Sequence, residues 1–176
     1  MSSSDSGIGR AVALAFARED ASIVISYLNE DEDAVKIQKA VEESGLFDLV
    51  RYAVPHMPKG GEIINVGSIQ VYDPSAEILD YATTKAAIVG FTKGLARKLL
   101  EKGIHVNCVA PESVWTPLVV ASFSKEKNSQ FGSNYLIKRP AQARELAPAF
   151  VFLACGVDSS YVSGKLLAVT GGEPTV

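Results

Sequence analysis

The sequence predicts an α/β domain built on a parallel sheet, and three observations support this expectation. Four apolar runs rich in Val and Ile have the length of buried strands, at 22–28, 62–67, 104–109 and 166–170. Amphipathic segments with helical spacing lie between them. Strands and helices thus alternate along the chain, which is typical of a parallel sheet with right-handed crossovers. We expect about four strands with flanking helices.

The helices expected from this pattern differ in how clearly their ends are marked. A first helix begins just after Gly7 or Gly9, and a polar loop is expected over 122–138. The remaining helices are expected at 31–44, 46–57, 81–102 and 141–153. In helix 46–57 we expect Phe47, Val50 and Val54 to be buried, and Gly103 should end helix 81–102.

Length and composition limit the classes of protein to consider. The chain has 176 residues, 47% of them hydrophobic and 21% charged, enough to bury a core and sufficient for one domain. The net charge of −3 and the lack of a basic run disfavour nucleic-acid binding. Neither a signal peptide nor a membrane-spanning apolar stretch is evident, so we expect a cytoplasmic protein that does not bind a membrane.

The two cysteines do not form a recognisable motif. Cys108 and Cys155 lie far apart in apolar runs, without the spacing of metal ligands. We expect two buried free thiols and no metal site.

Three further features carry chemistry. Ser6-Gly7-Ile8-Gly9 opens a helix, where free N–H groups and the helix dipole favour a phosphate, although a turn also uses glycine for steric reasons. Tyr81 and Lys85 share one helix face at i and i+4, so the ammonium can favour the phenolate and make the tyrosine a general acid or base. Ser68 ends a predicted strand, where parallel sheets bind ligands.

Each of these features also has an ordinary structural explanation. Tyrosine and lysine pairs at this spacing are common on helix surfaces, and Ser68 could merely cap a strand. Their occurrence together, after the glycine-bearing helix start, favours a catalytic site.

Five motifs, named at the end of this paragraph, resemble those of the short-chain dehydrogenase/reductase family. They occur in the family's order, and together they cover most of the chain. Residues 115–118 and 131–133 are most similar to the branch of NADP-dependent aldehyde reductases and glucose and ribitol dehydrogenase homologues. The motifs are Ser6-Gly7-Ile8-Gly9, Ile63-Ile64-Asn65-Val66-Gly67-Ser68, Tyr81-Ala82-Thr83-Thr84-Lys85, Ile104-His105-Val106-Asn107-Cys108-Val109-Ala110-Pro111 and Val169-Thr170-Gly171-Gly172.

The resemblance implies a single Rossmann-like domain over 1–176 and a defined set of roles. Tyr81 would exchange a proton with the substrate oxygen, Lys85 would assist it and hold the nicotinamide ribose, and Ser68 would polarise the carbonyl. The cofactor would be NADP or NAD, with Ser6, Gly7, Ile8 and Gly9 at the pyrophosphate and Val114 and Thr116 at the nicotinamide. Residues 122–138 would form a mobile substrate lid.

The chain also departs from the family pattern. The first strand and the Asn-Ala-Gly turn are missing, and about two βα units, roughly 60 residues, are absent near Gly45. We therefore expect strand 23–28 to pair beside strand 62–67, and the glycine turn to lose its place over the pyrophosphate.

Two side chains bear on the cofactor. Glu112 replaces the family glycine after Pro111 and puts a carboxylate where the nicotinamide should pass. Tyr27 stands where NAD-preferring members carry an acidic residue, which favours NADP(H), whereas Asp5 argues against a strongly basic pocket, so the choice stays open.

Two functional hypotheses follow from this pattern. The first is an oxidoreductase that transfers hydride between NAD(P)(H) and an alcohol, aldehyde, ketone or sugar. The alternative is a non-catalytic remnant or partner subunit with weak or no cofactor binding. In either case a homo-oligomer could form through the helix 81–102 and the C-terminal strand.

Overall fold

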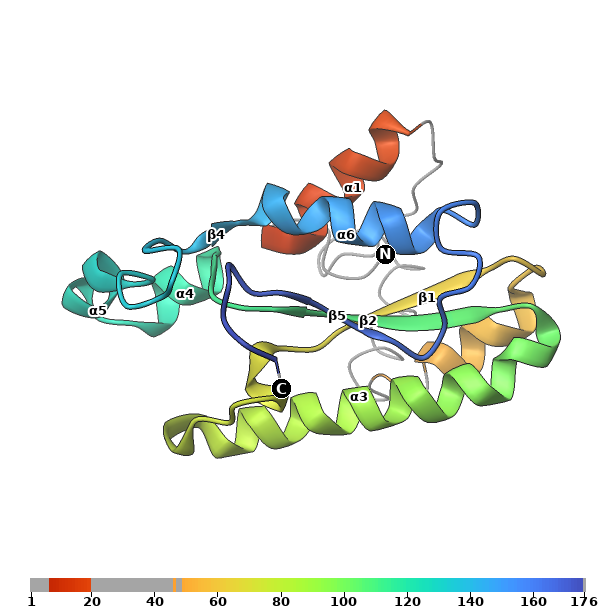
Figure 1. Ribbon diagram of the computed structural model, residues 1–176, viewed down its shortest axis with the longest axis horizontal. Coiled ribbons are helices and arrows are strands. Elements are labelled where there is room, and N and C mark those ends of the chain that lie inside the picture. Colours follow the sequence, from red (N-terminus) through yellow and green to blue (C-terminus); the bar gives the residue numbers. More distant parts are fainter. Residues whose placement is uncertain (1–6, 20–45, 47–48, 176) are drawn as a thin grey trace, which may run out of the picture.

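The computed structural model describes residues 7–19, 46 and 49–175 and has three layers (Figure 1). A parallel sheet has the strand order β1-β2-β5, where β1 is Glu62–Val66, β2 is His105–Pro111 and β5 is Leu166–Val169. Helices α1 (Gly7–Arg18) and α6 (Ala143–Ala154) cover one face, and α3 (Leu79–Leu99) covers the other. The predicted α/β class with a parallel sheet and flanking helices is confirmed.

The expected boundaries agree closely with these elements. The third expected helix continues from α3 into a 3-10 turn, Leu100–Lys102, and Gly103 ends it at φ +68 in the left-handed region. Residues 49–53 are helical and lead into a second 3-10 turn, Val54–His56. Val50 is buried there and Val54 half-buried, whereas Phe47, strand 23–28 and helix 31–44 lie outside the described residues.

The region expected to be a polar loop proves to be partly helical. It contains α5 (Lys125–Gln130) and begins at the last residue of α4 (Pro117–Ser122), and both helices extend beyond the carboxyl ends of the strands (Figure 1). Ser124 caps α5 by accepting a hydrogen bond from the Lys127 N–H, a local signal that the polarity of the segment obscured. A two-residue parallel pair, β3 (Val114–Trp115) with β4 (Ala141–Gln142), joins this region to the start of α6.

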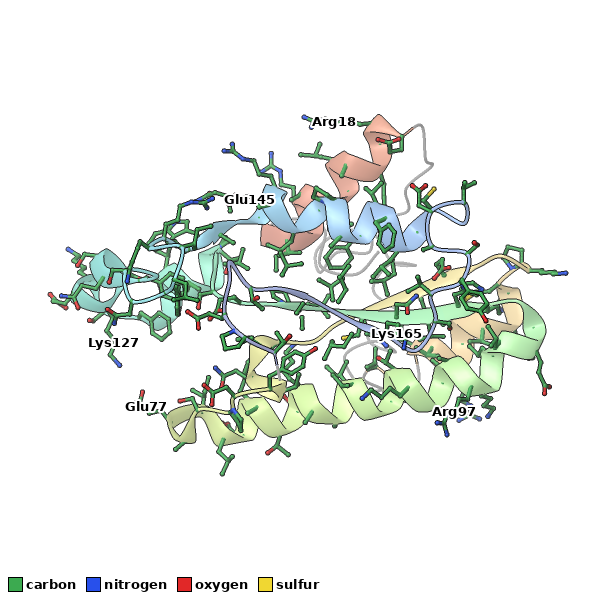
Figure 2. All side chains as sticks on the ribbon, viewed as in Figure 1. Arg18, Glu77, Arg97, Lys127, Glu145 and Lys165 are labelled. Atoms are coloured by element: carbon green, nitrogen blue, oxygen red, sulfur yellow. The ribbon has the colours of Figure 1, made fainter. Side chains whose placement is uncertain are left out.

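The larger apolar core lies between the sheet and the α1/α6 layer, where side chains from four elements meet (Figure 2). Its buried members are Val12, Val109, Val114, Leu146, Ala147, Phe150 and Leu153. A smaller cluster under α3 contains Ala96, Leu99, Ile104 and Val106. Within the described residues no helix is both long and apolar enough to cross a membrane.

Candidate active site

The candidate site lies at the carboxyl end of the sheet, where Ser68 follows β1. The Ser68 side chain is only 7% exposed, and its Oγ accepts a hydrogen bond from the backbone N–H of Gln70 at 3.2 Å. Ser68 therefore does cap the 3-10 turn that follows the strand. Because the oxygen acts as acceptor in this bond, the hydroxyl proton is left to donate to a ligand.

Tyr81 and Lys85 lie in the first turns of α3, beside the end of β1. The Lys85 Nζ is 5.5 Å from the centre of the Tyr81 ring, and it donates a hydrogen bond to the Val66 carbonyl oxygen at 3.0 Å. Tyr81 is 42% exposed, so it is not part of the core. The structure thus links Tyr81 through Lys85 to the strand end two residues before Ser68.

Burial affects the charge of the groups under this site. It lowers the pKa of Lys85, an effect that a thiolate at Cys108 would oppose. Burial raises the pKa of Cys108 to about 11, against the opposing effect of the Gly67 N–H, so the thiol is neutral near pH 7. Both cysteines are free; Cys108 is buried, as expected, whereas Cys155 is only half-buried.

A buried hydrogen bond that the sequence analysis did not single out fixes α3 on the sheet. Asn65 Nδ2 in β1 donates to Thr92 Oγ1 in α3 at 2.8 Å, and Thr92 Oγ1 donates to the Ile88 carbonyl oxygen. Both side chains are buried. Because Asn65 precedes Ser68 by three residues and Thr92 follows Lys85 by seven, this bond sets the position of the lysine relative to the serine. The signal in the sequence was Asn65 itself, because a polar residue inside a predicted buried strand needs a hydrogen-bond partner.

Gly67 allows the strand end to approach β2 closely. Its N–H donates to the Val109 carbonyl oxygen at 2.8 Å, and a Cβ at this position would lie 3.0 Å from Cys108 Sγ. A side chain here would push β1 away from β2 and displace Ser68.

The start of α1 lies beside the loop after β2. Gly7 has φ +53, and a Cβ built on it would be 3.5 Å from Thr116 Cγ2. The reason is packing: Val12 is buried among Val114 and the α6 side chains, which docks α1 on this face of the sheet. Gly7, Ile8, Gly9, Val114 and Thr116 therefore lie in one region, whereas Ser6 lies outside the described residues.

A mainly apolar cavity of about 400 Å³ adjoins this contact. Among the neighbouring aromatic rings, Phe131 lies 5.9 Å from Trp115 and 5.8 Å from Phe123, measured between ring centres, and Tyr135 hydrogen-bonds Ser113. The cavity is lined by Trp115, Thr116, Pro117, Val120 and Ala121.

Glu112 introduces a carboxylate near the same strand ends. Its N–H donates to the Val169 carbonyl oxygen at 3.1 Å, and its Oε2 is buried without a hydrogen-bond partner. Burial, and then the neighbouring Glu173, raise the pKa of Glu112. The carboxyl group is therefore more readily protonated than an exposed one. Elsewhere in the described residues, no cluster of three His, Cys, Asp or Glu side chains could hold a metal ion.

The fold is Rossmann-like, and comparison with known proteins defines the family. The family model described as enoyl-(acyl carrier protein) reductase matches residues 40–173. An uncharacterized oxidoreductase of Escherichia coli, YghA, is 37% identical over 235 residues, covering 96% of this chain and 80% of the relative. That alignment is longer than the chain, so the relative carries residues that have no counterpart here.

Two further matches agree. NADPH-dependent aldehyde reductase 1 from Arabidopsis thaliana chloroplasts is 52% identical over 126 residues, covering 72% of this chain but 44% of the relative. The crystal structure of a 3-oxoacyl-[acyl-carrier protein] reductase from Brucella melitensis is 26% identical, with a TM-score of 0.80 and coverage of 97% and 88%. The chain belongs to the short-chain dehydrogenase/reductase family, an oxidoreductase family.

Proposed function

We propose that this chain is an oxidoreductase that transfers hydride between NAD(P)(H) and a small alcohol, aldehyde, ketone or sugar: the hydride would leave the carbinol carbon in oxidation and add to the carbonyl carbon in reduction. The observation that carries the proposal is the contact of Lys85 with both the Tyr81 ring and the strand end before Ser68. It supports a site in which a base, a cation and a hydroxyl would act together at the carboxyl end of a parallel sheet.

Each side chain has one role in this reaction. Ser68, whose proton is free to donate, holds the substrate oxygen. Tyr81 gives a proton to that oxygen during reduction and takes it back during oxidation. Lys85 stabilises the tyrosinate, and the pKa lowered by burial makes this assistance weaken as pH rises. The apolar cavity beside Thr116 would take the substrate's carbon chain, and residues 122–138 would cover it as a lid.

The described residues fit the nicotinamide half of the cofactor. The N–H groups at the start of α1 offer an anion site next to Thr116, and Gly7 lacks a side chain that would obstruct it. Bound there, NAD(P)(H) would supply or accept the hydride. The name of the Arabidopsis relative supports NADPH and an aldehyde. We keep both cofactors in the proposal, with NADP(H) favoured.

Two observations favour the alternative, a non-catalytic remnant or partner subunit. Lys85 already commits one of its three N–H donors to the Val66 carbonyl oxygen, which restricts how its ammonium can reach a ribose hydroxyl. Glu112 adds a buried carboxyl group near the nicotinamide position. Both would weaken cofactor binding. A cytoplasmic location, and a homo-oligomer through α3 and β5, stay predictions under either hypothesis.

The test compares Tyr81→Phe with the control Tyr161→Phe, which alters a fully exposed tyrosine. NADPH and NADH are titrated by cofactor fluorescence and thermal shift, and reduction of a panel of aldehydes and sugars is then assayed. We expect saturable binding by all three proteins and a loss of turnover of at least about 100-fold in Tyr81→Phe alone. If neither cofactor binds, the non-catalytic alternative holds.

A further inference from the structure

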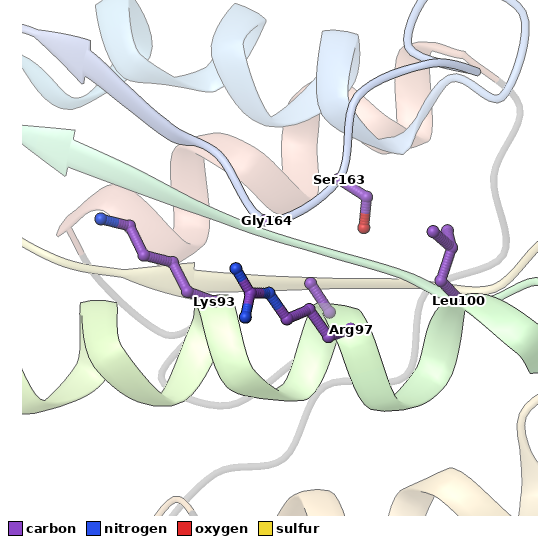
Figure 3. Close-up of a pocket in the computed structure, with 6 residues that line it drawn as sticks. Lys93, Arg97, Leu100, Ser163 and Gly164 are labelled. Atoms are coloured by element: carbon purple, nitrogen blue, oxygen red, sulfur yellow. The ribbon is translucent and has the colours of Figure 1, made fainter.

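A second cavity lies on the opposite end of α3 from Tyr81 and Lys85. It has a volume of about 290 Å³ and lies between the last turns of α3 and the segment that leads into β5 (Figure 3). Lys85 and Arg97 are twelve residues apart, about 18 Å along a helix, so this cavity is distinct from the candidate active site. It is lined by Lys93, Ala96, Arg97, Leu100, Ser163 and Gly164.

Two small residues create the hollow. Ala96 forms its floor, and Gly164 passes over it so closely that a Cβ on the glycine would lie 3.4 Å from the Ala96 Cβ. Gly164 has φ +72, a conformation that favours glycine. Its N–H donates to the Val106 carbonyl oxygen, which ties this segment to β2. The cavity is therefore a defined feature of the fold.

The polar groups of this cavity are hydrogen-bond donors. The Arg97 guanidinium lies beneath Gly164, the Lys93 side chain extends from α3 to the left in this view, and the Ser163 hydroxyl is directed toward the helix (Figure 3). Ser163 Oγ accepts from the Val106 N–H at 3.3 Å, which leaves its proton to donate. No carboxylate lines the cavity. Within the described part of the chain, neither Lys93 nor Arg97 forms an ion pair.

Helix stability alone does not explain both cations. Arg97 is in the last turn of α3, where it interacts favourably with the helix dipole, but Lys93 is a turn further in. Like charges at i and i+4 repel each other, so the pair costs free energy unless an anion lies between them. The chain as a whole is acidic, with a net charge of −3, which makes a paired cationic cavity a local departure.

We propose that this cavity binds a phosphate group, as inorganic phosphate or as the phosphate of a small metabolite. Arg97 would bind two phosphate oxygens through its planar guanidinium, Lys93 would add a point charge, and the Ser163 hydroxyl would donate to a third oxygen. The volume is near the lower end for ligand sites, about 300 Å³, which suits a small ligand. This proposal does not depend on the proposed oxidoreductase activity.

Inorganic phosphate is the first probe, titrated into the full chain by calorimetry and thermal shift at constant ionic strength maintained with sodium chloride. The variants are Lys93→Ala, Arg97→Ala and their combination, with Lys98→Ala as a control that removes an exposed cation of the same helix outside the cavity. A simple phosphate monoester, glycerol phosphate, then distinguishes a free anion from a metabolite as the ligand.

We expect saturable phosphate binding by the wild type and by Lys98→Ala, about tenfold weaker binding in each single variant, and none in the double variant. Without phosphate, the four variants should unfold at the same temperature as the wild type. Binding that persists in the double variant, that falls equally in Lys98→Ala, or that is absent from the wild type would overturn the proposal. If phosphate binds instead at the start of α1, the double variant will still bind it.

Discussion

The two faces of the sheet are held by different kinds of interaction. The α1/α6 layer is attached by large apolar side chains from both helices and from β2, including Val12, Leu146 and Phe150. On the other face, α3 buries mainly small residues, with Leu99 as the one large exception. There a directional bond between Asn65 and Thr92 adds to the packing.

This difference matches what each layer does. Apolar contacts stabilise the fold but tolerate small shifts, whereas a buried hydrogen bond is lost if the two groups move apart. The helix that carries Tyr81 and Lys85 is the one whose position is fixed by such a bond. Packing on the α1/α6 face therefore mainly stabilises the fold, whereas the bond on the α3 face fixes the position of the helix that carries Tyr81 and Lys85. Three experiments test this division.

The largest effect is expected from Leu146→Ala, because Leu146 is fully buried between α6 and the sheet. Removing its side chain should lower the free energy of unfolding by about 2–5 kcal/mol. Urea denaturation measures the change. Leu14→Ala, which truncates an exposed leucine on α1, should change stability by less than about 0.5 kcal/mol. Similar losses in both variants would contradict the apolar attachment of this layer.

Thr92→Val should cost less stability but affect positioning. Valine has nearly the same shape as threonine but cannot accept the Asn65 hydrogen bond, so a buried amide is left unsatisfied, at about 1–3 kcal/mol. The matched control is Thr83→Val: Thr83 makes the same kind of bond within α3, to the Leu79 carbonyl oxygen, but is exposed.

Thr92→Ser retains the hydroxyl and should restore most of the stability lost in Thr92→Val. Urea denaturation of the three variants measures this order. If Thr92→Val is no less stable than Thr83→Val, the directional bond does not hold α3.

The smallest effect concerns Glu62, a half-buried carboxyl group on the α6 face of β1. Glu62 alternates with Ile63 along β1 and therefore faces α6, with His105 Nδ1 at 3.3 Å from its Oε1. Burial raises the pKa of Glu62 from 4.5 to about 7. Because the folded-state pKa is the higher one, its contribution is fully present below pH 4.5 and is lost as pH rises through 7.

Glu62→Gln should remove this loss, since glutamine is uncharged at every pH. Between pH 5 and pH 8 the wild type should lose about 1–2 kcal/mol more stability than the variant, measured by urea denaturation at each pH. Glu101→Gln, at an exposed position, serves as the control. Parallel pH curves for the wild type and Glu62→Gln would show that Glu62 does not titrate in this range.

Much of the fold could be predicted because its signals are local. The Val and Ile runs of β1, β2 and β5 and the left-handed glycine at 103 all act through nearby residues, and their boundaries agree to within about two residues. The prediction of a loop over 122–138 was wrong because it too relied on local composition, which is that of a loop. The Ser124 cap and the aromatic cluster around Phe131 order the segment into turns and a short helix.

The candidate site was predictable in its residue types but not in its contacts. Tyr81 and Lys85 are related by helix geometry, so their proximity follows from the sequence. The bond from Lys85 to the Val66 carbonyl oxygen joins residues nineteen positions apart, and no local pattern indicates it.

The sequence by itself determined the α/β class, the family and the three side chains proposed for catalysis, because these depend on local periodicity, on the four-residue spacing of Tyr81 and Lys85 and on the order of motifs. Only the tertiary structure decided that α1 docks beside Thr116, that Asn65 and Thr92 tie α3 to β1, and that Lys93, Arg97 and Ser163 share a cavity. Each of these joins segments distant in sequence, and their contacts form only when the layers pack.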